Sequence, residues 1–188
     1  AGGRVFVGSV SGTVYSLDAA TGCIHWTHQA GAGVRSAISI GPLGSDSKAG
    51  STRDGARAGS IRHAVYFGDF KANVYAVDAD TGELLWKTPV EDHPAARVTG
   101  APLLHAGRLY VPVSSLDEVY GGNSQYECCK FRGSVVALDA QSGKQIWKTY
   151  TIAETPQPTG KKKQGTQLWG PSGAAIWSAP TLDLKRRA

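Results

Sequence analysis

The sequence has no methionine, only three cysteines and no long apolar run. The cysteines are Cys23 and the adjacent Cys128 and Cys129, so neither the C-x-x-C spacing of a zinc site nor the C-x-x-C-H sequence of attached haem occurs. No apolar stretch approaches the roughly 20 residues that a membrane-spanning helix needs. We therefore expect no zinc site, no attached haem and no membrane span, and we interpret Cys23 as a small buried hydrophobic residue.

The chain also lacks an initiator methionine and a recognisable signal peptide. Its opening resembles the interior of a longer protein, so the missing signal carries no information about location. The formal net charge is +5, and the obvious basic clusters are residues 161–163 and 185–187. Both lie in predicted turns without interleaved aromatic residues, which favours solvated loops over a nucleic-acid site.

What the sequence does contain is an internal repeat. Its 24 glycines accompany many valines, tyrosines and tryptophans, a composition typical of short strands joined by tight turns. Residues 14–26, 74–86 and 135–147 share one pattern, in which an Asp precedes a Gly by four residues and a Trp by eight. The pattern predicts a β-hairpin whose Asp bonds the turn backbone, whose Gly supplies a positive φ and whose Trp packs between neighbouring sheets. These residues are therefore expected to be structural.

A further strand is predicted in each repeat, at residues 34–38, 98–102 and 176–180. Four strands per repeat make a propeller blade, once residues 41–62 and 152–175 are read as inserted loops. The predicted fold class is all-β, a partial and open β-propeller of four-stranded antiparallel blades. A blade cannot bury both faces alone, so we expect about three blades of a larger ring. The expected division is a blade remnant at 1–33, blades at 34–96 and 97–175, and the start of another at 176–188.

The pattern V-Y-A-L-D-A-x-T-G-x-x-x-W is similar to the tryptophan-docking repeat of dehydrogenases that depend on pyrroloquinoline quinone (PQQ), which are eight-bladed propellers. The resemblance covers nearly the whole chain. A non-catalytic outer-membrane assembly lipoprotein uses a similar repeat, so the function must be argued from the site residues.

Aligning the three inner strands on a shared alanine places Arg35, Thr99 and Trp177 on one rung. The family resemblance implies that this rung lines the central axis and contacts PQQ, with the Arg on its carboxylates and the Trp stacked under its rings. A flat aromatic tricarboxylate needs a π platform and fixed cations, which these residue types supply. The alternative is a core tryptophan and a surface ion pair of Arg35.

A second cluster, residues 113–118, resembles the family's Ser-Ser-x-x-Glu stretch. The resemblance implies that Ser114 and Ser115 are cofactor contacts and that Glu118 or Asp117 binds Ca²⁺, since a hard cation prefers carboxylate oxygens. The register leaves the choice between the two acids open. The alternative is a solvated acidic turn.

Cys128 and Cys129 resemble the adjacent cysteines that form a disulfide against the cofactor in many PQQ alcohol dehydrogenases. The resemblance implies this disulfide and a cofactor contact, with two reduced thiols as the alternative. The sequence departs from the family in one respect. The usual pair shortly precedes the equivalent of Arg35, whereas here it lies in an insertion after Glu118.

The resemblance as a whole implies a quinoprotein that oxidises alcohols with PQQ and Ca²⁺, passes electrons to cytochrome c or another acceptor, and is periplasmic or secreted. Residues 111–115, 127–129 and 167–173 resemble the polyvinyl-alcohol dehydrogenase branch most closely, which favours secondary alcohols. Arg97 is interpreted as an extra anion ligand or as a partner of Glu91 or Asp92.

The family's catalytic base is expected beyond Ala188, so no catalytic residue is assigned and this chain alone is not expected to turn over substrate. Two alternatives remain. One is a non-catalytic propeller scaffold for protein–protein interaction in the cell envelope, and the other is a glucose-type quinoprotein.

Overall fold

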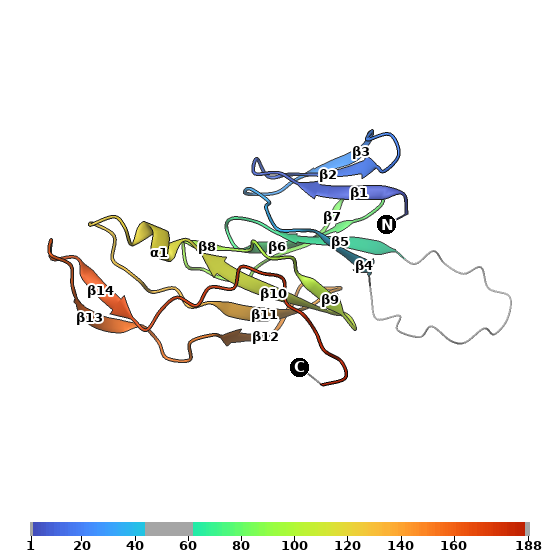
Figure 1. The fold of residues 1–188 in the computed structure, drawn as a ribbon. Coiled ribbons are helices and arrows are strands. Elements are labelled where there is room, and N and C mark those ends of the chain that lie inside the picture. Colours follow the sequence, from blue (N-terminus) through green and yellow to red (C-terminus); the bar gives the residue numbers. More distant parts are fainter. Residues whose placement is uncertain (1, 44–61, 187–188) are drawn as a thin grey trace.

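The computed structural model describes residues 2–43 and 62–186, which form an open arc of antiparallel sheets lying side by side (Figure 1). The first sheet contains, in order, β1 (Arg4–Gly8), β2 (Thr13–Asp18) and β3 (Ile24–Gln29). The second contains, in order, β4 (Ser39–Pro42), β5 (His63–Gly68), β6 (Asn73–Asp78) and β7 (Leu84–Pro89). The chain is therefore an open arc of a β-propeller, as predicted.

The third sheet has the order β12 (Gln145–Tyr150), β11 (Ser134–Asp139), β10 (Arg108–Ser115) and β8 (Ala96–Arg97), with β9 (Leu103–His105) also paired to β10. Helix α1 (Asp117–Tyr120) follows β10, and a hairpin of β13 (Gln157–Lys161) and β14 (Gln167–Gly170) follows β12. In the described part of the chain no helix has the length and apolarity to cross a membrane.

The repeated turn has the predicted geometry in all three copies. The bonds that close it are Thr21 N to Asp18 at 2.8 Å, Thr81 N to Asp78 at 3.1 Å and Ser142 N to Asp139 at 2.8 Å. The glycine that follows each Asp by four residues has a φ between +70° and +77°. The hydroxyls of Thr21 and Ser142 also donate to Asp18 and Asp139, and together with the backbone donors they lower the pKa of both carboxyls.

Tryptophans join the sheets as predicted. The buried indole of Trp26 in β3 donates from Nε1 to the Ala79 carbonyl of the second sheet at 3.0 Å. A Cβ on Gly82 would lie 2.7 Å from the Trp26 ring, so only glycine lets the turn seat against the indole. The next joint repeats the arrangement, with Trp86 Nε1 donating to the Ala140 carbonyl at 3.0 Å.

The core consists of two apolar clusters between the sheets. One lies between the first and second sheets and includes Val14, Trp26, Val34, Phe67 and Val77. The larger one lies between the second and third sheets and includes Tyr66, Val98, Leu109, Phe131 and Leu138. Phe131 packs in this cluster near the end of the long segment that connects β10 to β11, and this segment carries Asp117, Glu118, Cys128 and Cys129.

The inner strands begin later than predicted. Residues 34–38, 98–102 and 176–180 form no strand, and the paired segments start at Ser39 in β4 and Leu103 in β9. The predicted segments bond the carbonyls of neighbouring loops and strand ends instead of a β-ladder. The equivalent bonds are Val34 N to Ser9 O at 2.8 Å, Val98 N to Asp69 O at 3.0 Å and Ile176 N to Val113 O at 3.2 Å. The strand bounds were wrong, whereas these matching bonds support the equivalence of the three segments.

Two further expectations need correction. Residues 152–175 are not simply a loop, because they contain the β13–β14 hairpin, whose turn residues include Lys162 of the first basic cluster. Cys23 is exposed, not buried, since it follows the turn glycine at the position that Glu83 and Lys144 occupy in the other copies. Most of the insertion expected at 41–62, and Arg187 of the second basic cluster, lie outside the described residues. The boundary drawn between residues 96 and 97 falls within β8.

Candidate functional site

The three rung residues lie on equivalent inner segments. Arg35 is exposed, and it makes no hydrogen bond or ion pair to any residue that the structure describes. Thr99 is half-buried, and the indole of Trp177 is 44% exposed. All three side chains are therefore open to contact with a ligand. Their convergence on a single pocket stays a prediction.

Contacts between the inner segments link them in series. Phe70 N donates to the Gly33 carbonyl at 2.9 Å, and the guanidinium of Arg97 lies 4.9 Å from the Phe70 ring centroid. These contacts connect the segment of Arg35 to that of Thr99. A Cβ on Gly100 would lie 2.8 Å from the Ser178 backbone, so the next segment is also in close contact. The structure thus brings the segments of the three rung residues side by side.

The hydroxyl of Thr99 belongs to a short polar chain. Thr99 Oγ1 and Ser114 Oγ are 2.9 Å apart, and Ser114 Oγ donates to the Arg97 carbonyl at 3.1 Å. Because the single hydroxyl proton of Ser114 goes to that carbonyl, Thr99 donates to Ser114 and keeps lone pairs free to accept from a ligand. Ser114 and Ser115 are completely buried, and Ser115 Oγ accepts from Asp117 N at 3.2 Å.

Arg97 carries an unsatisfied donor beside this chain. Its Nε is buried and has no hydrogen-bond partner among the described residues, while Nη2 donates to the Tyr120 hydroxyl at 3.2 Å. The alternative of an ion pair with Glu91 or Asp92 is wrong, because Glu91 pairs with Lys148 at 2.6 Å and Arg97 forms no ion pair with any described residue. A buried guanidinium nitrogen without a partner is costly.

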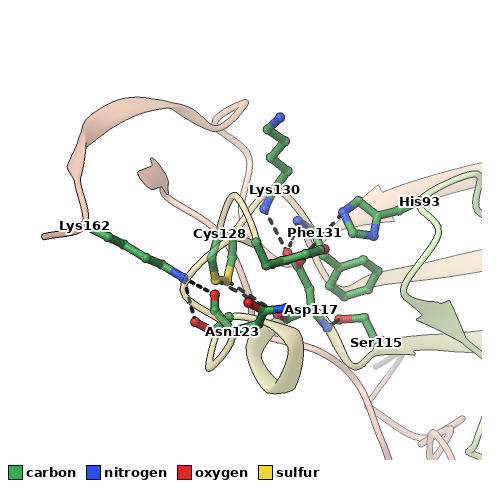
Figure 2. The surroundings of a disulfide bond; sticks show 11 residues. His93, Ser115, Asp117, Asn123, Cys128, Lys130, Phe131 and Lys162 are labelled. Carbon is green, nitrogen blue, oxygen red and sulfur yellow. Dashed lines mark hydrogen bonds and ion pairs between the residues drawn. A yellow bond between two sulfur atoms is a disulfide. The ribbon is translucent and has the colours of Figure 1, made fainter. Parts of the chain in front are cut away.

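The carboxylate of Asp117 is hydrogen-bonded by other groups of the same chain (Figure 2). It is buried and accepts from the Tyr126 hydroxyl at 2.5 Å and from the backbone N–H groups of Lys130 and Phe131, both at 2.8 Å. Burial and the bond to Asp117 raise the pKa of Tyr126. Glu118, one residue further along α1, is exposed. The arrangement therefore favours Glu118 over Asp117 as the acid that could reach a cation.

The disulfide implied by the family resemblance is present. Cys128 and Cys129 are bonded to each other across a cis peptide, and Cys129 Sγ lies 3.7 Å from the Asp117 carbonyl. The adjacent hairpin supports the disulfide, because Trp169 N in β14 donates to the Cys128 carbonyl at 2.7 Å. Lys162 Nζ donates to the carbonyls of Gly121 and Asn123 at 2.8 Å and 2.7 Å (Figure 2). Contact of the disulfide with a cofactor stays a prediction.

No group of three or more metal-ligating side chains gathers within the ranges 2–43 and 62–186. Sequence reasoning missed the β13–β14 hairpin that supports the disulfide segment. The signal available in the sequence was Gly165, a turn-forming residue between two short stretches. In the structure its φ is +91°, and the stretches on either side of it pair as β13 and β14. It also missed the role of Asp117, because the three groups that donate to its carboxylate follow no sequence pattern.

Three comparisons place the chain among known proteins. The family model PQQ_2, described as "Outer membrane protein assembly factor BamB", matches residues 1–160. The chain is 47% identical over 98% of its length to a polyvinylalcohol dehydrogenase of Pseudomonas sp, and 45% identical over 99% to one of Sphingopyxis sp. (strain 113P3). It spans 27% of the length of each of these two relatives.

The solved structures agree on the fold. The quinohemoprotein alcohol dehydrogenase ADHIIG of Pseudomonas putida HK5 superposes with a TM-score of 0.65 at 20% identity, over 97% of this chain and 26% of that one. The quinohemoprotein alcohol dehydrogenase of Comamonas testosteroni gives a TM-score of 0.56 at 19% identity, over 80% of this chain and 20% of that one.

Proposed function

The chain belongs to the PQQ_2 family of quinoprotein-type propellers, and from this premise we propose that it forms part of the cofactor site of an enzyme that oxidises alcohols with PQQ and Ca²⁺. The observation that carries the proposal is the series of contacts that brings the segments of Arg35, Thr99 and Trp177 side by side, with all three side chains open to a ligand.

The residues fit a flat tricarboxylate. Arg97 and the exposed Arg35 offer fixed cations for carboxylates, and the exposed face of Trp177 offers a stacking surface. Thr99 supplies a hydroxyl that can accept a hydrogen bond. We propose that these side chains hold PQQ, and that the bonded Cys128 and Cys129 cover it from the opposite face.

Glu118 is the proposed Ca²⁺ ligand, because its carboxylate is exposed while that of Asp117 is used by Tyr126 and two backbone N–H groups. When bound, PQQ would accept the hydride of the alcohol, and Ca²⁺ would polarise the quinone carbonyl as a Lewis acid. The residues of this chain would hold and orient the quinone. None of them is assigned as the base.

The names of the relatives support secondary alcohols, including polyvinyl alcohol, as the proposed substrate class. An electron acceptor such as cytochrome c, and a periplasmic or secreted location, complete the proposal. A second candidate is a non-catalytic scaffold in the cell envelope, which the description of the matching family model favours.

The experiment adds PQQ and Ca²⁺ to the full-length protein and measures holoenzyme absorbance and dye-coupled oxidation of secondary alcohols. We expect both signals, and we expect Arg35→Ala to weaken PQQ binding by about tenfold, the loss of one charge-assisted contact. Arg108→Ala is the matched control, since Arg108 is an exposed arginine at the start of β10. If wild-type protein neither binds PQQ nor oxidises any alcohol, the dehydrogenase proposal fails and the scaffold reading stands.

A further inference from the structure

A groove runs over the surface between the second and third sheets. One cavity of about 380 Å³ and a neighbouring, more open depression of about 410 Å³ share the lining residues Glu91, Asp92 and Tyr150. Because the two hollows meet at these residues, they form one elongated depression, the radial groove. An elongated depression suits an extended chain better than a compact ligand.

The inner end of the radial groove adjoins the candidate cofactor site. His93 and Phe131 line it, and Phe131 N donates to the Asp117 carboxylate at 2.8 Å. His93 Nε2 lies 3.9 Å from the same carboxylate. Asp117 in turn lies between the groove and the segment that carries Glu118 and the disulfide. The inner end of the groove therefore lies one buried side chain, that of Asp117, away from the segment that carries Glu118 and the disulfide.

The outer end lies at the outermost strands of both sheets. Pro89 ends β7 and Gln145 begins β12, and both line the outer depression. β7 and β12 are the edge strands farthest from the inner segments in the sheet orders. The groove therefore leads from the neighbourhood of the site to the rim of the arc, where a long molecule can continue into solvent.

Aromatic rings and balanced charges line the inner cavity. The guanidinium of Arg132 lies 3.9 Å from the Tyr150 ring centroid, and Lys130 Nζ lies 4.2 Å from that of Trp169. The charged lining residues are two acids, Glu91 and Asp92, and two bases, Lys130 and Arg132, so their formal charges cancel. The lining is therefore suited to a neutral ligand with both apolar and hydrogen-bonding parts.

Several polar groups along the groove can bond hydroxyls. Asp92 and Thr155 are exposed at the inner cavity, and the amide of Gln145 lies in the outer depression. A chain of alternating methylene and hydroxyl-bearing carbons matches this mixture, because its methylenes can lie on aromatic rings while its hydroxyls reach carboxylate, hydroxyl and amide groups.

We propose that the radial groove binds a neutral polyhydroxylated chain and thereby holds a polymeric alcohol while one of its hydroxyls is oxidised. This inference rests on the proposed oxidation of polyvinyl alcohol and adds the surface that holds the polymer and the path of the bound chain. Short alcohols do not need the groove, so it should affect only long substrates.

The test uses full-length holoenzyme with Thr155→Trp, which fills the inner cavity from its rim. Thr159→Trp is the matched control, since Thr159 is an exposed threonine of β13 that does not line the groove. The probes are polyvinyl alcohol and 2-butanol, and polymer binding is also measured by calorimetry. We expect Thr155→Trp to raise the KM for the polymer by about tenfold, as for the loss of one well-packed contact region, and to leave kcat/KM for 2-butanol within about twofold.

An equal loss with both alcohols, or no change with either, overturns the inference, because the groove then has no role specific to long chains. If wild-type protein binds the polymer but oxidises no alcohol, the proposed function fails. In that case the part of the inference that concerns polymer binding is retained when Thr155→Trp weakens binding, and the whole inference is overturned when it does not. Asp92→Ala, which removes an exposed hydrogen-bonding side chain from the groove, gives the same decision if Thr155→Trp does not fold.

Discussion

The contacts that join neighbouring sheets differ from the contacts that hold the disulfide segment in place. Each joint uses the same local device, an Asp–Gly turn of one sheet seated against a Trp of the sheet before it. The disulfide segment, by contrast, depends on one buried carboxylate, Asp117, which collects three donors from residues 126 to 131. The contacts between sheets are repeated along the chain, whereas the disulfide segment depends on one side chain. A single substitution at Asp117 can therefore disorder this segment while the sheets stay folded.

The largest effect is expected at a joint. Trp26→Ala removes a buried indole that packs against Gly82 and donates to Ala79, so it should lower the free energy of unfolding by about 3–5 kcal/mol. Trp147→Ala is the internal control. Trp147 occupies the same position in the third sheet but is 38% exposed, and its loss should cost less than about 1 kcal/mol. Denaturant unfolding of the 188-residue chain measures both, and equal losses would show that the joints do not depend on tryptophan docking.

The second effect concerns the disulfide segment. Asp117→Ala leaves the Tyr126 hydroxyl and the amides of Lys130 and Phe131 without their acceptor, which should cost about 2–4 kcal/mol. The loss should be local, with faster hydrogen exchange at these amides and unchanged exchange in β5 and β6. Asp117→Asn is the shape-conserving control. Its amide can donate back to Tyr126 while its oxygen keeps the backbone bonds, so most of the protection should remain, and equally fast exchange in both variants would contradict this assignment.

The contacts between sheets could be predicted from the sequence, whereas the contacts of the disulfide segment could not. The turns and joints were predictable because Asp18, Gly22 and Trp26 lie within eight residues of each other and recur three times. The donors to Asp117 and the burial of Arg97 Nε could not be read from the sequence, because both arise from tertiary packing. The groups that bond Asp117 are 9 to 14 residues away along a segment without a pattern. The inner strands were placed too early because their backbone donors bond distant carbonyls that no local pattern reveals.

Gly22 and Gly82 occupy the same turn position in two copies of the repeat but differ in what lies next to them. Gly22 and Gly82 have φ values of +73° and +77°, so an alanine at either position costs about 1–2 kcal/mol of backbone strain. A Cβ at Gly82 would also lie 2.7 Å from Trp26, whereas nothing lies within 4 Å of one at Gly22. Gly82→Ala should therefore destabilise the chain by about 1 kcal/mol more than Gly22→Ala in thermal or denaturant unfolding. Equal losses would show that the indole moves aside freely.

The smallest expected effect is a pH dependence of the unfolding free energy, which differs between the turns of Asp78 and Asp18. Burial alone would raise the pKa of Asp78, but Arg62, whose Nη2 lies 2.6 Å from Oδ2, and the backbone donors of the turn lower it below its ordinary value. A carboxyl with a lower pKa in the folded chain than in the unfolded chain stabilises the fold above pH about 4, and this stabilisation is lost as the pH falls through the folded pKa.

Asp78→Asn should therefore cost about 1 kcal/mol at pH 7, close to the value of one hydrogen bond, and the difference from wild type should shrink below pH about 4. Because Arg62 is 61% exposed, added salt should also reduce the difference. The Asp18 turn has its own hydroxyl and backbone donors, and the imidazole of His25 lies 3.8 Å from its carboxylate, farther than the 2.6 Å between Arg62 and Asp78, so Asp18→Asn should respond less to salt. Urea unfolding of the wild type and of both variants, from pH 7 to pH 3 at two salt concentrations, measures how the loss in unfolding free energy depends on pH and on salt. A difference that stays constant with pH would mean that the Asp78 carboxylate acts in the turn through its shape and not through its charge.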